Sequence, residues 1–460
     1  MINIESYPVV FVKDLVEKTP RPLCAMEMCF MHLKLLFYLK NIYQRFELDN
    51  DMKINNLSSY AKIVGKREID EIQAEAKKLS GKHITCVNST YQGGGVAEIL
   101  NSLVPLFDQV GVDFGWRILH GTPDFFTITK KFHNGLQGDS INLSQRKKDI
   151  YFETNRRFST FTHLENHDLV IIHDPQPLPL ISFYKKTQPW IFRCHIDISN
   201  PNKEVWDYLK GFIQKYDHFV VSLPEYKKDD LNMPQSVIHP AIDPVTAKNK
   251  PVSETKITKY LGKFGIDRKK PIISQVSRFD PWKDPIGVVK VFERVRKTID
   301  CQLVLLGQFA TDDPEGHKIL LSLQKKVDKS PFKHDIKLVV VDNAFLVNCL
   351  QRASSVVMQK SLKEGFGLTV AEALYKGTPV VASKVGGIPL QVLDGVNGFL
   401  HSPYDVKGFS DSVVKLLRNE KLRETLGKAG KEHVKKNFLI TRLLLDWLYL
   451  MNKVLAERRK

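Results

Sequence analysis

Several features that would assign the chain to a simple functional class are missing from its 460 residues. Its six cysteines lie far apart and form no Cys-x-x-Cys pair, which argues against a disulfide framework and predicts reduced thiols in a cytosolic protein. The lack of a Gly-x4-Gly-Lys-Ser/Thr loop argues against a Walker-type nucleotidase. RNP1, zinc-finger and basic-zipper patterns are missing too, so we expect no nucleic-acid partner.

Acidic residues are in the minority, and the net charge is +17 with a pI near 9.4. Lysine and arginine are nevertheless spread over the chain, so we interpret the surplus mainly as a solvated, lysine-rich surface. The hydrophobic content of 43% and the charged content of 26% are ordinary for a globular protein. The length suggests two or three domains, each able to bury its own core.

Long apolar runs free of charge are also scarce. Residues 24–44 are rich in large apolar side chains but include Glu27, Lys34 and Lys40, which makes them a poor membrane span. They lie too far into the chain for a signal peptide and lack its cleavage site. We predict that residues 1–51 are an extension outside the main fold. A peripheral amphipathic helix and a non-native extension from an upstream start codon are the open alternatives.

From about residue 68 onward, short buried strands alternate with helices. We expect strands at 83–90, 113–121, 168–174, 190–197, 218–224, 271–280, 301–308, 336–342, 354–361 and 378–387, and helices near 146–158, 176–185 and 202–215. This alternation predicts an α/β protein with two facing doubly wound Rossmann-like domains. The polar stretch 245–270 is the candidate linker, which places the domains at 52–250 and 265–438. Ligands of such sheets bind outside the carboxyl ends of the strands.

A glycine-rich turn follows the first expected strand. Gly93, Gly94 and Gly95 would let the backbone approach an anion at the start of the next helix. The spacing fits a dinucleotide fingerprint poorly, because Glu98 stands where a third small residue belongs. A tight turn with no ligand is the alternative interpretation.

Polar residues stand at the ends of three other expected strands. Asp174 and His195 are placed to contact substrate hydroxyls, although each is a weak signal by itself. Arg278 and Lys283 lie five positions apart across a turn, where two cations could neutralise a diphosphate. Surface salt bridges are the alternative for this pair.

Two glutamates, Glu364 and Glu372, flank the start of a helix that we expect from Leu368 or Thr369 to Gly377. The glycines before this helix would let backbone N–H groups face a phosphate. A carboxylate can accept hydrogen bonds from two neighbouring sugar hydroxyls. Together with the two upstream cations, the pattern indicates a nucleotide-sugar site.

In combination, these stretches resemble the retaining glycosyltransferases of family 4, which have the GT-B fold. The likeness is carried by Glu364-x7-Glu372 with Arg278 and Lys283 upstream, and by residues 87–106, 132–138, 173–177, 193–202, 275–283, 312–316 and 364–377. It covers roughly residues 60–440 and is specific in combination. Within the family, it is closer to the members that make trehalose.

The resemblance implies a role for each candidate residue. Glu372 would bind the donor ribose, Arg278 and Lys283 the diphosphate, and Glu364 the transferred glucose. The backbone of Gly365, Phe366, Gly367 and Leu368 would face donor sugar or phosphate, as would the Gly93–Gly95 loop from the N-terminal domain. His195 would lie beside the reacting sugar, and Asp174 would hold sugar hydroxyls. The first domain would be the acceptor side, the second would bind the nucleotide sugar, and the helix in 439–460 would cross back onto the first.

The implied reaction joins glucose from UDP-glucose or ADP-glucose to free glucose, giving α,α-trehalose with retained configuration, and it could run in reverse. No cofactor is required for donor binding in this scheme, while an assisting Mg²⁺ stays open. Family members often pair, so a homodimer is open too. The alternatives are a family 4 transferase with another acceptor, of the sucrose- or glycogen-synthase type, a nicotinamide-dependent sugar oxidoreductase, and a non-catalytic sugar-nucleotide sensor. The poor glycine fingerprint disfavours the oxidoreductase, and the presence of both cations disfavours the sensor.

Overall fold

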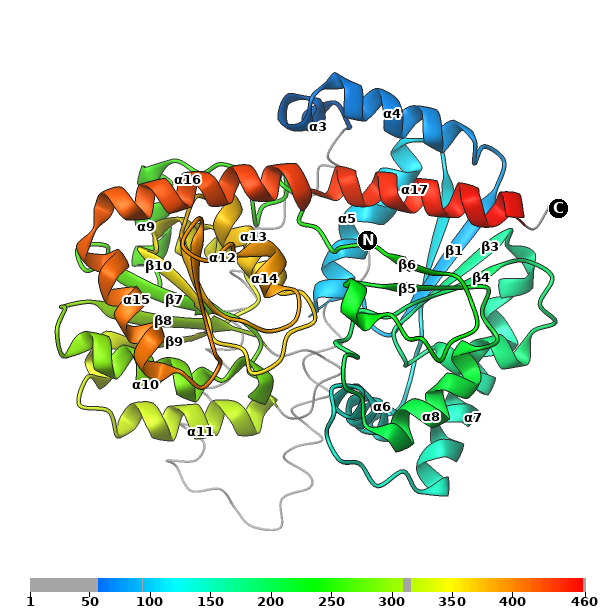
Figure 1. Ribbon diagram of the computed structural model, residues 1–460, viewed down its shortest axis with the longest axis horizontal. Coiled ribbons are helices and arrows are strands. Elements are labelled where there is room, and N and C mark those ends of the chain that lie inside the picture. Colours follow the sequence, from blue (N-terminus) through cyan, green and yellow to red (C-terminus); the bar gives the residue numbers. More distant parts are fainter. Residues whose placement is uncertain (1–56, 93, 309–315, 458–460) are drawn as a thin grey trace, which may run out of the picture. The chain divides into compact units, whose positions relative to one another are not determined.

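The computed structural model describes residues 57–457, apart from Gly93 and residues 309–315 (Figure 1). The predicted extension at 1–51 therefore lies outside the described residues, as do Gly93 of the glycine loop and most of the 312–316 stretch. In the part of the chain that is described, no helix combines the length and the apolar character that crossing a membrane requires.

Six parallel strands form the first sheet, in the order β2-β1-β3-β4-β5-β6. They are β1 (His83–Asn88), β2 (Asp113–Ile118), β3 (Leu169–His173), β4 (Trp190–Arg193), β5 (His218–Val221) and β6 (Gln235–Val237). Every residue of β3, β4 and β5 is buried. These strands are mainly apolar, apart from His173, Arg193 and His218, because helices cover a parallel sheet on both faces.

A second parallel sheet of six strands has the order β12-β11-β10-β7-β8-β9. Its strands are β7 (Ile272–Val276), β8 (Gln302–Gly307), β9 (Ile336–Val340), β10 (Val356–Gln359), β11 (Val380–Ser383) and β12 (Gly398–His401). Each sheet winds outward in two directions from its first strand. The strand order therefore reverses between β1 and β3, and again between β7 and β10. In open α/β sheets this switch point is where ligands bind.

Helices connect the strands of both sheets. Around the first sheet they are α3 (Leu57–Val64), α4 (Lys66–Lys77), α5 (Gly95–Gln109), α6 (Pro123–Leu136), α7 (Gln145–Thr162) and α8 (Lys203–Ile213). Around the second they are α9 (Glu254–Gly262), α10 (Pro285–Arg296), α11 (Gly316–Asp328), α12 (Ala344–Ala353), α13 (Leu368–Tyr375), α14 (Ile388–Gln391), α15 (Val406–Arg418) and α16 (Glu420–Asn437).

Three local expectations differ from the structure. The helix expected near 176–185 is a short 3₁₀ segment, η3 (Leu178–Phe183), because Pro175, Pro177 and Pro179 remove the backbone donors that an α-helix needs. The candidate linker at 245–270 contains the helix α9. The helix α6 was not predicted, although Thr122 caps it by accepting a hydrogen bond from the Phe125 amide, with Pro123 next in the chain.

The last helix, α17 (Ile440–Glu457), packs along α4 and α5 beside the first sheet (Figure 1, red). Its buried face presents Leu444, Trp447 and Leu448 to a core that includes Ile72 and Leu103. Helix α17 thereby completes a hydrophobic core to which α3 and α4, the first described helices, also contribute. The domain boundaries themselves stay a prediction.

We predict that Leu448→Ala lowers the free energy of unfolding by about 2–5 kcal/mol, because Leu448 is fully buried and alanine leaves a cavity. Lys453→Ala is the control on the same helix, since that side chain is 60% exposed. Urea unfolding of both variants measures the difference. Equal losses for the two variants would show that α17 is not part of the cooperative core.

Candidate active site

A cavity of about 650 Å³ lies at the carboxyl ends of the strands around both switch points. It is lined by every predicted site residue that the structure describes, namely Gly94, Gly95, Asp174, His195, Arg278, Lys283, Glu364, Gly365, Phe366, Gly367, Leu368 and Glu372. These residues come from loops separated by up to hundreds of positions in the chain. The loops after β1, β3 and β4 open at the carboxyl edge of the first sheet, the loops after β7 and β10 open at that of the second, and both edges line the cavity.

Two helix N-termini meet at this cavity. The N-cap residues are Gly94 for α5 and Gly367 for α13, and neither offers a capping side chain. Gly367 has φ 85°, a left-handed conformation that favours glycine. A Cβ added to Gly95 would lie 3.2 Å from Leu368 Cδ1, so the two helix starts are close neighbours. Their N–H groups and helix dipoles favour an anion between them.

Cations gather at the same place around one buried carboxylate, that of Asp280. Lys130 Nζ lies 3.0 Å and Arg278 Nη2 lies 3.8 Å from Asp280 Oδ2. Burial alone would raise the pKa of Asp280, but Lys130, Arg278 and Lys283 together lower that pKa to about 2. Asp280 also accepts a hydrogen bond from the Trp282 amide, which fixes the turn that carries Lys283.

His133, on α6 one turn after Lys130, also lines the cavity and is half-buried. Burial, together with the neighbouring Lys130 and Arg278, lowers the pKa of His133 to about 3. The imidazole is therefore neutral near neutral pH, so it contacts a ligand as a hydrogen-bonding group rather than as a cation.

Glu364 pairs with the predicted cation Lys283. Lys283 Nζ lies 2.5 Å from Glu364 Oε2, and the same oxygen accepts hydrogen bonds from Ser361 and Gln359 at 3.1 and 3.3 Å. The hydroxyl of Tyr226, from the first sheet's side, donates to the backbone carbonyls of Glu364 and Gly365. The loop after β10 is thus held by both halves of the molecule.

Glu372 has a different partner, which sequence reasoning did not identify. Its side chain is fully buried, and Oε1 lies 2.7 Å from Nζ of Lys248, a residue of the candidate linker. Lys248 also contacts Glu98 Oε2 at 2.7 Å. Burial raises the pKa of Glu372, but Lys248 and Lys376 outweigh it and hold this pKa below its ordinary value.

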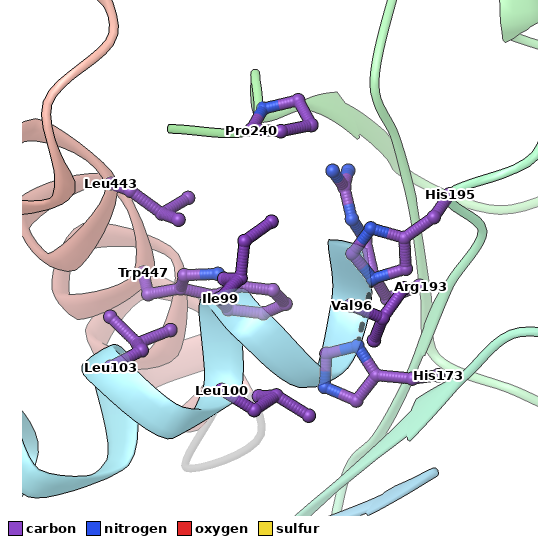
Figure 2. Close-up of a pocket in the computed structure, with 10 residues that line it drawn as sticks. All are labelled: Val96, Ile99, Leu100, Leu103, His173, Arg193, His195, Pro240, Leu443 and Trp447. Carbon is purple, nitrogen blue, oxygen red and sulfur yellow. Dashed lines mark hydrogen bonds between the residues drawn. The ribbon is translucent and has the colours of Figure 1, made fainter. Parts of the chain in front are cut away.

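His195 is hydrogen-bonded to a second histidine. His195 Nε2 lies 3.0 Å from His173 Nδ1 at the end of β3, as Figure 2 shows. Burial, followed by the nearby Arg193, lowers the pKa of both imidazoles, so both rings are neutral. Because neutral rings have one donor and one acceptor each, the tautomer of His173 sets that of His195.

His173 and His195 line both the large cavity and a small one of about 10 Å³, whose lining Figure 2 shows. Leu443 and Trp447 of α17 line the small cavity together with apolar residues of α5. It has room for about one water molecule. The last helix therefore supports the wall of the site.

Asp174 positions His195 through the backbone. Its Oδ1 accepts a hydrogen bond of 2.7 Å from the His195 amide, and its own amide donates to the Arg193 carbonyl. Asp174 has φ 61°, a left-handed conformation that costs a residue other than glycine about 1–2 kcal/mol. Strain of this kind concentrates at functional sites.

Lys130, His133, Glu98 and Lys248 are among the lining residues to which sequence reasoning gave no role. Lys130 and His133 recur at helical spacing on α6, and the proline that opens this helix was the available signal. Lys248 carried no signal, because nothing in a polar linker marks one lysine among several. Of the residues that the structure describes, no three histidine, cysteine, aspartate or glutamate side chains are grouped to hold a metal ion.

Matches to two known families cover most of the chain. Residues 86–228 match the trehalose synthase N-terminal domain, and residues 256–433 match glycosyl transferases group 1. The fold is similar to that of the UDP-forming α,α-trehalose-phosphate synthase from Burkholderia xenovorans, with a TM-score of 0.66 at 14% identity over 81% of this chain and 100% of that chain. The protein is a glycosyltransferase with the GT-B fold, which confirms the predicted fold class.

Two relatives are similar over nearly their whole length. The chain is 45% identical to the trehalose synthase of Thermococcus litoralis over 405 residues, which are 86% of this chain and 96% of the relative. It is 43% identical to the trehalose synthase of Pyrococcus horikoshii over 404 residues, with the same coverage. The chain therefore belongs to the trehalose synthase family of glycosyltransferases, and the predicted resemblance is confirmed.

We predict that Gly365→Ala lowers the free energy of unfolding by about 1–3 kcal/mol, because a Cβ at this position would lie 2.6 Å from the His195 carbonyl oxygen. Gly211→Ala is the matched control, since it lies in α8 with no atom within 4 Å of the new Cβ. We expect it to stabilise the protein by about 0.5–1 kcal/mol. Urea unfolding compares the two, and an unchanged Gly365→Ala would contradict the close approach of the two loops.

Proposed function

We propose that the protein transfers glucose from a nucleoside diphosphate glucose to free glucose and forms α,α-trehalose, with the configuration at the donor carbon retained. The observation that carries the proposal is the meeting of two uncapped helix N-termini with Lys130, Arg278 and Lys283 in one cavity. Such a site suits a diphosphate. The names of the relatives described above support trehalose as the product.

The donor would lie across the switch point of the second sheet. In this arrangement, Arg278 and Lys283 bind the diphosphate, and the backbone of α13's first turn faces its oxygens. Glu372 accepts hydrogen bonds from the ribose hydroxyls. Glu364, whose Oε2 is occupied by Lys283, Ser361 and Gln359, offers Oε1 to hydroxyls of the transferred glucose. Because the protein supplies these cations, the donor is proposed to bind without a metal.

The acceptor would approach from the side of the first sheet, where Asp174 and His195 line the cavity. A hydroxyl of free glucose attacks the donor carbon from the face that the leaving diphosphate occupies. The bond from that carbon to the phosphate oxygen breaks, a new carbon–oxygen bond forms, and the hydroxyl proton passes to the departing phosphate. Arg278 and Lys283 stabilise the charge that develops on this phosphate. His195, held neutral, contributes hydrogen bonds rather than a proton.

The decisive experiment supplies the purified protein with UDP-glucose or ADP-glucose and free glucose. We expect a non-reducing disaccharide that trehalase cleaves, formed equally well in EDTA. In parallel reactions, glucose 6-phosphate, fructose or a glucan replaces glucose as the acceptor. A further reaction contains maltose and no nucleotide, and it tests whether trehalose forms without a nucleotide-sugar donor. A product only from one of these alternatives would contradict free glucose as the acceptor. The reverse reaction is tested with trehalose and UDP or ADP.

We expect Lys283→Ala to lower the rate of glucose transfer about 10²-fold or more, because it removes a cation that stabilises the leaving diphosphate. Lys290→Ala is the matched control, since Lys290 is exposed on α10, seven positions further along the chain. Steady-state kcat/KM for the donor measures both variants. Full activity of a folded Lys283→Ala would rule out the diphosphate role.

A further inference from the structure

Lys248 joins two carboxylates that come from neighbouring helices of the two halves of the molecule. Its Nζ lies 2.7 Å from Glu372 Oε1 on α13, and 2.7 and 2.9 Å from the two carboxylate oxygens of Glu98 on α5. The Lys248 side chain is only 17% exposed, and Glu372 is not exposed at all. All three residues line the large cavity. The Lys248–Glu372 pair is therefore buried rather than a surface salt bridge, whereas the Glu98 side chain is 40% exposed.

The surroundings of Glu372 make Lys248 its main charge partner. Gln351 donates to Oε2 at a long 3.4 Å. Lys376 is the other cation nearby, but its Nζ donates to Asn249 Oδ1, Gln351 Oε1 and the Glu372 backbone carbonyl rather than to the carboxylate. A fully buried carboxylate without a paired charge would take up a proton or shift its position. Lys248 therefore keeps this group ionised and in place.

The proposed contact with ribose requires the ionised carboxylate of Glu372. A carboxylate accepts hydrogen bonds from two adjacent hydroxyls, whereas a protonated carboxyl has to use one oxygen as a donor. Glu372 Oε1 lies 2.7 Å from the Lys248 ammonium, and a carboxylate oxygen has more than one acceptor position. The ion pair thus fixes this oxygen without using all of its acceptor positions.

Glu98 extends the connection to the glycine loop. It lies in the first turn of α5, whose N-cap is Gly94. A residue bound to Lys248 is therefore three to four positions from the loop that the proposed function places at the donor phosphates. Lys248 comes from neither helix, so it links the ribose side of the site to the phosphate side.

We propose that Lys248 is the positioning residue of the donor ribose site: it holds Glu372 ready to accept the ribose hydroxyls and anchors it through Glu98 to the start of α5. The inference rests on the proposed function, because it assumes that Glu372 binds ribose. Lys248 itself touches no reacting atom. It makes the site selective for ribonucleotide over 2′-deoxyribonucleotide donors.

The test measures binding of UDP and of 2′-deoxy-UDP by calorimetry, without any sugar transfer. For the wild type, we expect 2′-deoxy-UDP to bind about 10-fold or more weakly, as for a lost hydrogen bond to a charged group. In Lys248→Met, UDP should lose about 10-fold in affinity, and the preference for the ribonucleotide should fall below about 3-fold. Lys248→Arg should keep most of the preference, because it keeps the charge.

A control variant, a second test variant and kinetic and unfolding measurements separate a positioning role from a general loss of structure. Lys256→Met changes an exposed lysine on α9 and should bind both nucleotides as the wild type does. Glu98→Gln should reduce the preference in the same direction as Lys248→Met but less. In steady-state transfer, Lys248→Met should raise the donor KM more than it lowers kcat and leave the glucose KM unchanged. Thermal unfolding shows whether each variant is folded.

A folded Lys248→Met with the wild-type preference for UDP would overturn the inference. An unchanged preference in Glu98→Gln would overturn the anchoring through α5. If Lys248→Met does not fold, loss of the preference in a folded Lys248→Arg would count against the charge-based role, and its retention would support it. A wild type that binds neither nucleotide would instead refute the proposed donor site, so the two failures are distinguishable.

Discussion

The parallel arrangement of the two sheets is the constraint on which the site depends. In a parallel sheet every strand ends at the same edge, so loops far apart in the chain open side by side. Asp174 follows β3, His195 follows β4, Lys283 follows β7 and Glu364 follows β10, and all four line one cavity. Each sheet places its own pair of side chains at its carboxyl edge, and the two edges line the same cavity.

Charge pairing between distant segments then offsets the cost of burying acidic side chains in this assembly. Asp280, Glu364 and Glu372 are all buried, and an unpaired buried carboxylate is costly. Each has a lysine from another segment: Lys130 from α6, Lys283 from the turn after β7 and Lys248 from the linker. The net charge of +17 does not describe this arrangement, since the cavity alternates cations with acids. An anionic ligand would instead contact the cations that lie around Asp280, which include Lys130 and Arg278.

Much of the fold and of the site was predictable because the signals were local. Short apolar runs indicated the buried strands, and the flanking glycines indicated helix α13. The sequence patterns were misleading at η3 and α9, and the helix α6 was not recognised. Prolines turned the expected helix at 176–185 into η3, and α9 interrupts a stretch whose composition suggested a linker. The helix α6 carries Lys130 and His133, so missing it also meant missing two residues of the site.

The sequence by itself determined the α/β class, the family and the residues that stand at the strand ends, because these depend on local patterns and on motifs. Only the tertiary structure decided which charges meet. Glu364 and Lys283 are 81 positions apart, and Glu98 and Lys248 are 150 apart. An ion pair depends on distances of a few ångströms, and spacing along the chain does not encode such a distance. The partner of Glu372 was therefore visible only after the two sheets had placed α5 and α13 at the same cavity.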